Sequence, residues 1–167
     1  MAGPSVTNDT AEVTAQHRVL VIDDDEDVRL ITRVNLTFDG FSVDEAADGR
    51  TGLAQAREAP PDIVVLDVMM PGCDGLTVLR EIRADPLLGA IPVALLTAAV
   101  SAAAETAGWA AGATAYLTKP FTAVALATTL RQLLAAKPAD REQRHDTAVA
   151  RLDLAHRLSR ERNPSDW

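Results

Sequence analysis

The chain has 167 residues, of which 47% are hydrophobic, 24% charged and 4% aromatic, and its formal net charge is −8. This length can bury one sizeable core with a modest extension, and the apolar fraction excludes a largely disordered chain. The charge is uneven, because residues 1–136 hold 9 Lys and Arg against 18 Asp and Glu, whereas residues 137–167 hold 7 against 6. An acidic body lacks the positive footprint of nucleic-acid binding, so we expect no nucleic acid among the partners of this chain.

Several features bear on where the protein works. No apolar run approaches the roughly 20 residues that a membrane span requires, so we expect no membrane association. Residues 1–16 hold neither a basic nor an apolar block, which argues against a secretory signal and predicts a flexible leader. The single cysteine, Cys73, is expected in a loop after Met70–Pro71–Gly72 and cannot form an internal disulfide. It fits a reducing compartment, and together these features predict a soluble cytoplasmic protein.

Five short apolar segments recur along the chain at intervals of about 20 to 30 residues, the length of a strand with a returning helix. They are residues 18–23, 41–46, 62–67, 91–97 and 114–118. The first, third and fourth are nearly continuous Val, Ile and Leu, which is typical of strands covered on both faces. The second alternates more strongly between polar and apolar residues, so we expect it nearer an edge of the sheet.

Helical patterns fill the intervals between these strands. They cover residues 25–38, 49–58, 74–84, 101–111 and 122–136. The first carries acids in its first turn and is followed by Gly40, and the last ends at Lys137–Pro138 because proline cannot continue a helix. Alternating strands and helices with right-handed crossovers predict an α/β fold. We expect a doubly wound parallel sheet of five strands, with helices on both faces, over residues 17–136.

The remaining residues, 137–167, are expected to form a linker and a separate helix over 139–162. Apolar side chains form a broad stripe on this helix: Ala148, Val149, Leu152, Ala155 and Leu158. Two partners could cover the stripe, namely the main domain itself or the same helix of a second chain, and exposed stripes usually mark an interface. A free-standing coiled coil of about three heptads would be marginal. We therefore expect a weak homodimer in which this helix packs with support from the face formed by residues 101–136.

Polar side chains follow the predicted strands at their carboxyl ends, where open parallel sheets bind ligands. The first strand ends at Asp23–Asp24, the third at Asp67 and the fourth at Thr97, and the fifth leads to Lys119–Pro120. Three carboxylates at one edge repel each other, and one lysine cannot neutralise them, so the site requires a cation. Oxygen ligands at an open edge suit Mg²⁺. A cation beside a lysine makes a positive pocket for a phosphoryl group, in which a carboxylate can act as nucleophile.

Four segments carry a resemblance to a known family: VLVIDDDEDVR, VVLDVMMPGCDGL, VALLTA and YLTKPF. In order and approximate spacing they resemble the receiver domain of bacterial two-component response regulators, and the resemblance covers about residues 17–136. It implies a flavodoxin-like fold, like that of the chemotaxis regulators, with five helices and the sheet order 2-1-3-4-5.

The resemblance also assigns roles to the residues at the strand ends. It implies that Asp67 is the phospho-accepting aspartate and that Asp23 and Asp24 hold Mg²⁺, together with Asp67 and the backbone carbonyl of Met69. Within the acidic run we favour Asp23 and Asp24 as the ligands because they directly follow the apolar strand. Asp25 and the acids after it suit the N-terminus of the first helix better.

Further roles concern the groups that respond to phosphorylation. The resemblance implies that Thr97 is the switch hydroxyl that bonds the phosphoryl group, and that Lys119 contacts a phosphoryl oxygen and precedes a cis peptide to Pro120. Tyr116 corresponds to the aromatic residue that follows the switch, although a static core aromatic is also compatible with its position. Trp109 on an alanine-rich helix fits either a core residue or an exposed interface anchor.

The function implied is a switch in phosphorelay signal transduction. A sensor histidine kinase or a phosphotransfer protein donates the phosphoryl group to Asp67, and the face formed by residues 101–136 changes its affinity for a partner. We expect no enzyme beyond self-phosphorylation and slow autodephosphorylation. The rival is a Mg²⁺-dependent phosphotransferase or phosphatase that acts on small substrates, which needs a second acid soon after the nucleophile. No output domain fits in residues 137–167, so the chain is either a stand-alone regulator or part of a longer protein.

Overall fold

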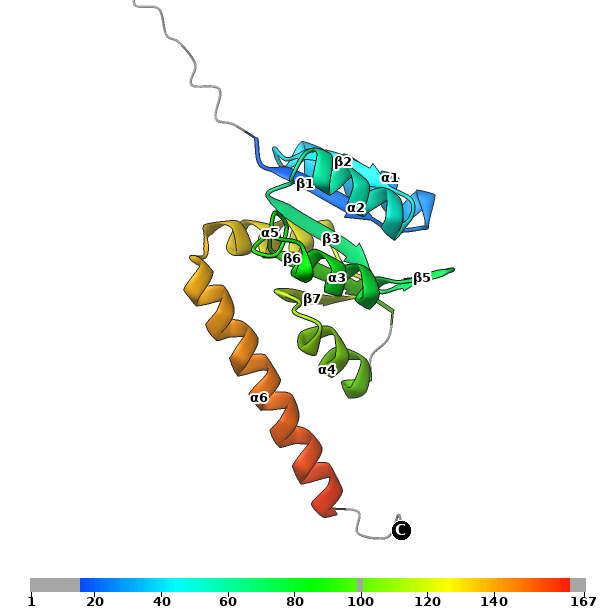
Figure 1. The fold of residues 1–167 in the computed structure, drawn as a ribbon. Coiled ribbons are helices and arrows are strands. Elements are labelled where there is room, and N and C mark those ends of the chain that lie inside the picture. The colour runs from blue at the N-terminus through cyan, green and yellow to red at the C-terminus, as the bar shows by residue number, and fades with distance from the viewer. Residues whose placement is uncertain (1–15, 99–100, 163–167) are drawn as a thin grey trace, which may run out of the picture.

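The computed structural model of the chain describes residues 16–98 and 101–162 (Figure 1). The leader predicted over residues 1–16 therefore lies, apart from Gln16, outside the described residues. No helix in the described part of the chain is both long enough and apolar enough to cross a membrane.

The centre of the fold is a parallel sheet. Its strands, in spatial order, are β2 (Ser42–Ala46), β1 (Arg18–Ile22), β3 (Ile63–Asp67), β6 (Val93–Thr97) and β7 (Ala115–Thr118), and each neighbouring pair is parallel. Since β6 and β7 are the fourth and fifth strands of this sheet along the chain, the predicted order 2-1-3-4-5 is confirmed. Every residue of β3 and β6 is buried, whereas β2 lies at an edge and is mostly half-buried, as its alternating sequence indicated.

Helices cover both faces of the sheet (Figure 1). They are α1 (Glu26–Phe38), α2 (Gly49–Glu58), α3 (Gly75–Ala84), α4 (Ala102–Ala110) and α5 (Ala123–Ala135). Alternate residues of β1 serve the two faces, because Leu20 and Ile22 pack in an apolar cluster with α2 and α3, and Val19 and Val21 pack in another with α1 and α5. This alternation is the direct result of the period of two in a strand. Helices on both faces leave the strand ends as the open edge of the sheet.

Each of these five helices begins at a polar residue whose side chain accepts hydrogen bonds from backbone N–H groups of the first turn. The capping residues are Asp25, Asp48, Asp74, Ser101 and Thr122. A cap of this kind contributes about 1 kcal/mol by satisfying donors that the helix itself leaves unpaired. The prediction that Asp25 serves the first helix is confirmed, because its carboxylate accepts from the N–H groups of Asp27 and Val28.

One element was not predicted. Met69–Met70 (β4) and Cys73–Asp74 (β5) form a short antiparallel hairpin where the sequence indicated a loop. The chain reverses at Pro71–Gly72, and Gly72 has a φ of +72°, a conformation that side-chain-bearing residues rarely adopt. Two-residue strands are too short to show a periodic pattern, so the sequence carried no signal for them.

The predicted tail helix is present as α6 (Pro138–Arg162), and it lies beside α4 of the same chain (Figure 1). Its half-buried residues form one stripe: Arg141, His145, Ala148, Val149 and Leu152. Ala155, which the sequence placed on the stripe, is exposed, and the side chain of Leu158 lies outside the described residues. The sequence left open whether the main domain or the same helix of a second chain covers the stripe. In the structure, the early turns of α6 dock on the main domain of the same chain.

Candidate functional site

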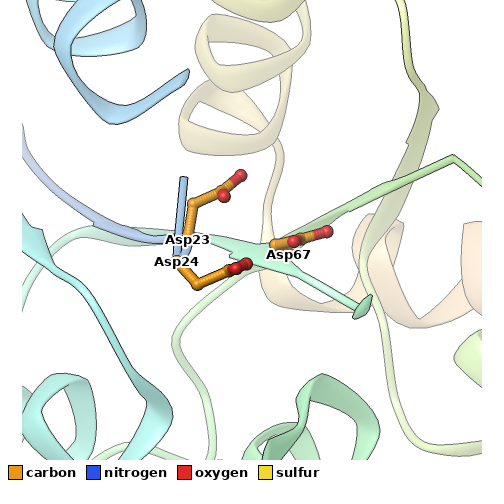
Figure 2. Close-up of side chains that lie close together, drawn as sticks. All are labelled: Asp23, Asp24 and Asp67. Atoms are coloured by element: carbon orange, nitrogen blue, oxygen red, sulfur yellow. The ribbon is translucent and has the colours of Figure 1, made fainter. Parts of the chain in front are cut away.

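Three carboxylates meet at the carboxyl ends of the central strands (Figure 2). Asp23 and Asp24 directly follow β1, and Asp67 is the last residue of β3. Each offers one oxygen atom, and these atoms lie within 4.8 Å of one another. Asp23 is 0% exposed and Asp67 is 4% exposed, whereas Asp24 is an exposed residue. The cluster therefore combines two buried carboxylates with one side that is open to solvent.

Lys119 supplies the positive charge at this cluster. It follows β7 and is joined to Pro120 by a cis peptide bond, as the resemblance implied. Its Nζ lies 2.9 Å from Asp23 Oδ2 and 3.4 Å from Asp67 Oδ1. Burial alone would lower the pKa of Lys119, but its hydrogen bond to Asp23 and the charges of Asp23 and Asp67 outweigh burial and raise that pKa. The ammonium group therefore stays charged between the two buried carboxylates.

One ammonium group does not balance three carboxylates. Burial, and after it the charge of Asp23, raise the pKa of Asp67, although Lys119 and the N–H of Met69 act in the opposite direction. Among the described residues, no other Lys or Arg side chain lies within ion-pair distance of these three carboxylates. An all-oxygen donor set with excess negative charge and one open side is the environment that Mg²⁺ prefers. The residues present therefore fit a divalent cation.

Arg29, which was not among the residues predicted from the sequence, holds the acidic pair in place. Its Nη1 donates to the carbonyl oxygens of Asp23 at 2.8 Å and Asp24 at 3.0 Å, while its Nε lies 3.9 Å from a carboxylate oxygen of Glu45. The guanidinium thus contacts the backbone of the pair and leaves their carboxylates to other partners. The sequence did carry a signal for this role. The backbone carbonyls of Asp23 and Asp24 need hydrogen-bond donors, and Arg29 lies in the first turn of the helix that follows them.

The start of α3 packs against the backbone around Asp67 and fixes its position. A Cβ atom on Gly75 would lie 2.2 Å from the carbonyl oxygen of Asp67, so no side chain fits at this position. The N–H of Gly75 donates to the carbonyl of Val68 at 3.0 Å, and the N–H of Met69 donates to Asp67 Oδ1 at 3.3 Å. The side chain of Met69 is turned outward, with 66% of the residue exposed. Met69 therefore meets the site through its backbone.

Thr97 and Tyr116, the expected switch pair, lie next to each other. Thr97 ends β6 and is 0% exposed, and Tyr116 lies on the neighbouring strand β7. Burial raises the pKa of the Tyr116 phenol, the nearby Thr97 hydroxyl lowers it in part, and the charge of Glu105 raises it further. The buried phenol is near Thr97 but not in hydrogen-bonding geometry with any described residue. Tyr116 thus has a buried hydroxyl that its present position does not fully satisfy.

Comparison with known proteins places this arrangement in a family. Residues 19–131 match the family model described as the response regulator receiver domain. Response regulator MprA of Mycolicibacterium vanbaalenii is 42% identical over 138 residues, which are 83% of this chain and 59% of that protein. Response regulator PleD of Caulobacter vibrioides is 45% identical over 117 residues, which are 70% of this chain and 26% of that protein. The chain thus spans 59% and 26% of the length of these two curated relatives.

Solved structures agree with the sequence matches. The chemotaxis protein CheY4 of Vibrio cholerae superposes with a TM-score of 0.69 at 34% identity, over 71% of this chain and 99% of that one. The receiver domain of the Francisella response regulator 1452 gives a TM-score of 0.67 at 30% identity, over 71% of this chain and 97% of that one. The chain therefore belongs to the response regulator receiver domain family and is a receiver of phosphorelay signalling.

Proposed function

We propose that Asp67 accepts the phosphoryl group in this receiver. The observation that supports this most is the position of Asp67, which lies beside the exposed opening of the cluster and 3.4 Å from the ammonium group of Lys119. A carboxylate oxygen of Asp67 attacks the phosphorus atom, the bond from phosphorus to the donor atom breaks, and the donor keeps the electron pair. Lys119 then neutralises part of the charge on the phosphoryl oxygens, and Thr97 hydrogen-bonds one of them.

We propose Mg²⁺ as the cation of this site, held by carboxylate oxygens of Asp23, Asp24 and Asp67 and by the backbone carbonyl of Met69. When bound, it supplies further positive charge for the phosphoryl oxygens. Asp24 is the exposed member of the set, so it leaves the site accessible from solvent, and Arg29 holds the backbone of the pair.

The partners follow from this role. Receiver domains of response regulators interact with histidine kinases, and we propose that a sensor histidine kinase or a phosphotransfer protein is the donor for Asp67. Residues 17–136 are the proposed receiver, and residues 137–167 add the linker and α6. One relative, from Synechocystis, is named a DNA-binding master transcriptional regulator, but that description concerns the whole of that protein. For this chain we propose control through protein partners, and the cytoplasmic location stays a prediction.

Labelling by a small phosphoryl donor tests the proposed function. Incubation with acetyl phosphate and Mg²⁺ should add one phosphoryl group per chain, visible by intact-protein mass spectrometry, and EDTA should prevent it. The same protein should not turn over p-nitrophenyl phosphate at a steady rate, because Val68, Met69 and Met70 follow Asp67 and supply no second acid. Sustained turnover of the phosphomonoester would favour the rival phosphatase function, and labelling that is indifferent to EDTA would contradict the role of Mg²⁺.

The weak homodimer expected from the sequence stays a proposal. Because α6 docks on α4 of its own chain, less of the apolar stripe remains for a second copy, and Leu154 is the large apolar side chain of α6 that is most exposed among those described. Sedimentation velocity over a concentration series should show a rising sedimentation coefficient at tens of micromolar. A sedimentation coefficient that stays at the monomer value over this range would contradict the proposed dimer.

A further inference from the structure

Tyr116, one of the expected switch residues, packs directly against α4. A Cβ atom on Gly108 would lie 2.7 Å from Cε2 of the Tyr116 ring and 2.9 Å from a methyl group of Leu95. The ring and the backbone of α4 are therefore in contact, and only glycine permits this approach. Gly108 is also the one residue of α4 that is fully buried. A change in the position of the Tyr116 ring removes the surface on which this turn of α4 rests.

The same turn of α4 carries two further side chains that face its neighbours. Glu105 lies close enough to Tyr116 for its charge to raise the pKa of the phenol. The indole Nε1 of Trp109 donates to Glu105 Oε1 at 3.4 Å, a long hydrogen bond between residues four apart on the helix. Within one turn, α4 thus contacts the ring of Tyr116 at Gly108 and carries Trp109 at the next position. Trp109 and Tyr116 are both half-buried against the same core cluster.

Trp109 is where α6 meets α4. The indole contacts the ring of His145 edge to face, with the centroids 5.9 Å apart and the planes at 63°. Nδ1 of His145 also lies 3.2 Å from the carbonyl oxygen of Ala113, just after α4. These two contacts anchor the early turns of α6 (Figure 1) on the end of α4. The docking of α6 therefore depends directly on where α4 lies.

The interface beneath α6 is not tightly closed. The first turns of α6 border a cavity of about 430 Å³, which is lined by Arg83, Arg141, Glu142 and His145 and by the loops that precede β6 and β7. The Nε atom of Arg141 is buried there without a hydrogen-bond partner among the described residues. Burial, and after it the charge of Arg141, lower the pKa of Arg83 to about 10. The unpaired donor of Arg141 and its repulsion of Arg83 oppose docking, so the favourable contacts of α6, among them those of His145, must outweigh both.

We propose that α6 is an intramolecular cover of α4, held by Trp109 while Tyr116 rests against Gly108 and released when phosphorylation of Asp67 repositions Thr97 and Tyr116. This inference rests on the proposed function, because phosphorylation of Asp67 is the event that moves Thr97. In the unphosphorylated chain the hydroxyls of Thr97 and Tyr116 lie together. Drawing Thr97 toward a phosphoryl oxygen takes its hydroxyl away from the Tyr116 phenol, whose oxygen has no hydrogen-bond partner among the described residues, and opens room into which the ring can move from beneath α4.

Release has two consequences that can be measured. The surface of α4 around Trp109 becomes available to a protein partner only after phosphorylation, as does the half-buried stripe of α6. Because coupling between two equilibria is reciprocal, any change that undocks α6 must also favour the phosphorylated state. Couplings of this kind usually change an equilibrium by about fivefold or more.

Hydrogen–deuterium exchange of the full chain tests the proposal. With acetyl phosphate and Mg²⁺, amides of residues 139–149 and 106–113 should exchange at least about fivefold faster than in the unphosphorylated protein. Amides of α2, which lies away from α4 and α6, should not change and serve as the internal reference. The Asp67→Asn variant under the same conditions should show the exchange pattern of the unphosphorylated chain, which excludes a direct effect of the reagent.

A matched pair of variants separates docking from helix stability. His145→Ala removes the contact with Trp109, and Gln143→Ala changes an exposed position of the same helix. His145→Ala alone should speed exchange in residues 139–149 without acetyl phosphate and raise the labelled fraction at limiting acetyl phosphate, whereas Gln143→Ala should do neither. Labelling of the native chain with no change in exchange overturns the cover, as does fast exchange of α6 in both states. Absence of any label on the native chain overturns the proposed function, and the inference falls with it.

Discussion

Replacing Asp67 with asparagine is expected to abolish labelling by acetyl phosphate and, without Mg²⁺, to stabilise the folded chain. The amide keeps the shape of the side chain but is not a nucleophile, so no acyl phosphate forms. Its effect on stability follows from the raised pKa of Asp67, which burial and then the charge of Asp23 cause. The fold therefore disfavours the ionised carboxylate, and the neutral amide removes that penalty. We expect the Tm to rise by about 2–4 °C, the change that about 1 kcal/mol gives in a chain of this size.

The pH dependence of this difference is a sharper test than its size. The unfolded carboxyl titrates near 3.8 and the folded one at a higher pH. Between these values the folded chain binds more protons than the unfolded chain, so this group makes the native protein less stable as the pH rises. The Tm difference between Asp67→Asn and the native chain should therefore be smallest below this window and grow through it. A difference that is equally large at every pH would show that crowding of charge is not its cause.

Mg²⁺ should reverse the order of stability of the native chain and Asp67→Asn. A divalent cation relieves the repulsion around the ionised Asp67, and binding to the folded state alone raises stability. The native chain should thus gain more in Tm from Mg²⁺ than Asp67→Asn, which keeps only two of the three carboxylates. Equal rises in Tm in both proteins would show that Asp67 does not hold the metal.

The strands and the edge of the sheet that carries the site could be predicted because both depend on local patterns, whereas the strand order was implied by the resemblance to receiver domains. Continuous Val, Ile and Leu runs identify strands that are covered on both faces, and parallel strands bring their carboxyl ends to one edge. Once Asp23 and Asp67 stand at the ends of adjacent strands, their proximity follows from the topology, and β1 does pair with β3. The helix caps are equally local, since each needs only one polar residue before an amphipathic segment.

The contacts that the sequence could not specify are those in which several partners are compatible with one pattern. Trp109 fitted a core residue or an interface anchor, and the structure makes it half-buried in the core and in contact with His145 of α6. Nothing in the sequence explained Gly108 in an alanine-rich helix. The reason is the register of β7, which places Tyr116 directly against this residue. The stripe on α6 predicted an interface but not its partner, because a helix pattern states which face is apolar and not what covers it.

Replacing Lys119 with methionine should have the largest effect on stability, a loss of about 3–5 kcal/mol, the usual result of removing one member of a buried ion pair. The ammonium group lies between Asp23 and Asp67, and Asp23 is 0% exposed, so its carboxylate loses its only charged partner among the described residues. The pKa of Lys119 is raised above 10.5 in the folded chain. The stabilisation that its ion pairs give is therefore fully present near neutral pH, and it is lost only as the pH rises through the raised pKa. Urea unfolding near neutral pH measures the loss.

The other lysine of the chain provides the matched control. Lys137 is exposed between α5 and α6, and Lys137→Met should change the free energy of unfolding by less than about 0.5 kcal/mol. In Lys119→Met the two buried carboxylates retain their repulsion without compensation, so acid and Mg²⁺ should each recover part of the loss, acid by protonating a carboxylate and Mg²⁺ by replacing the missing charge. Because the native chain already holds one positive charge there, Mg²⁺ should stabilise Lys119→Met by more than it stabilises the native chain. If the loss is small, or if neither acid nor Mg²⁺ reduces it, Lys119 is a packing residue and the cluster is balanced by some other group.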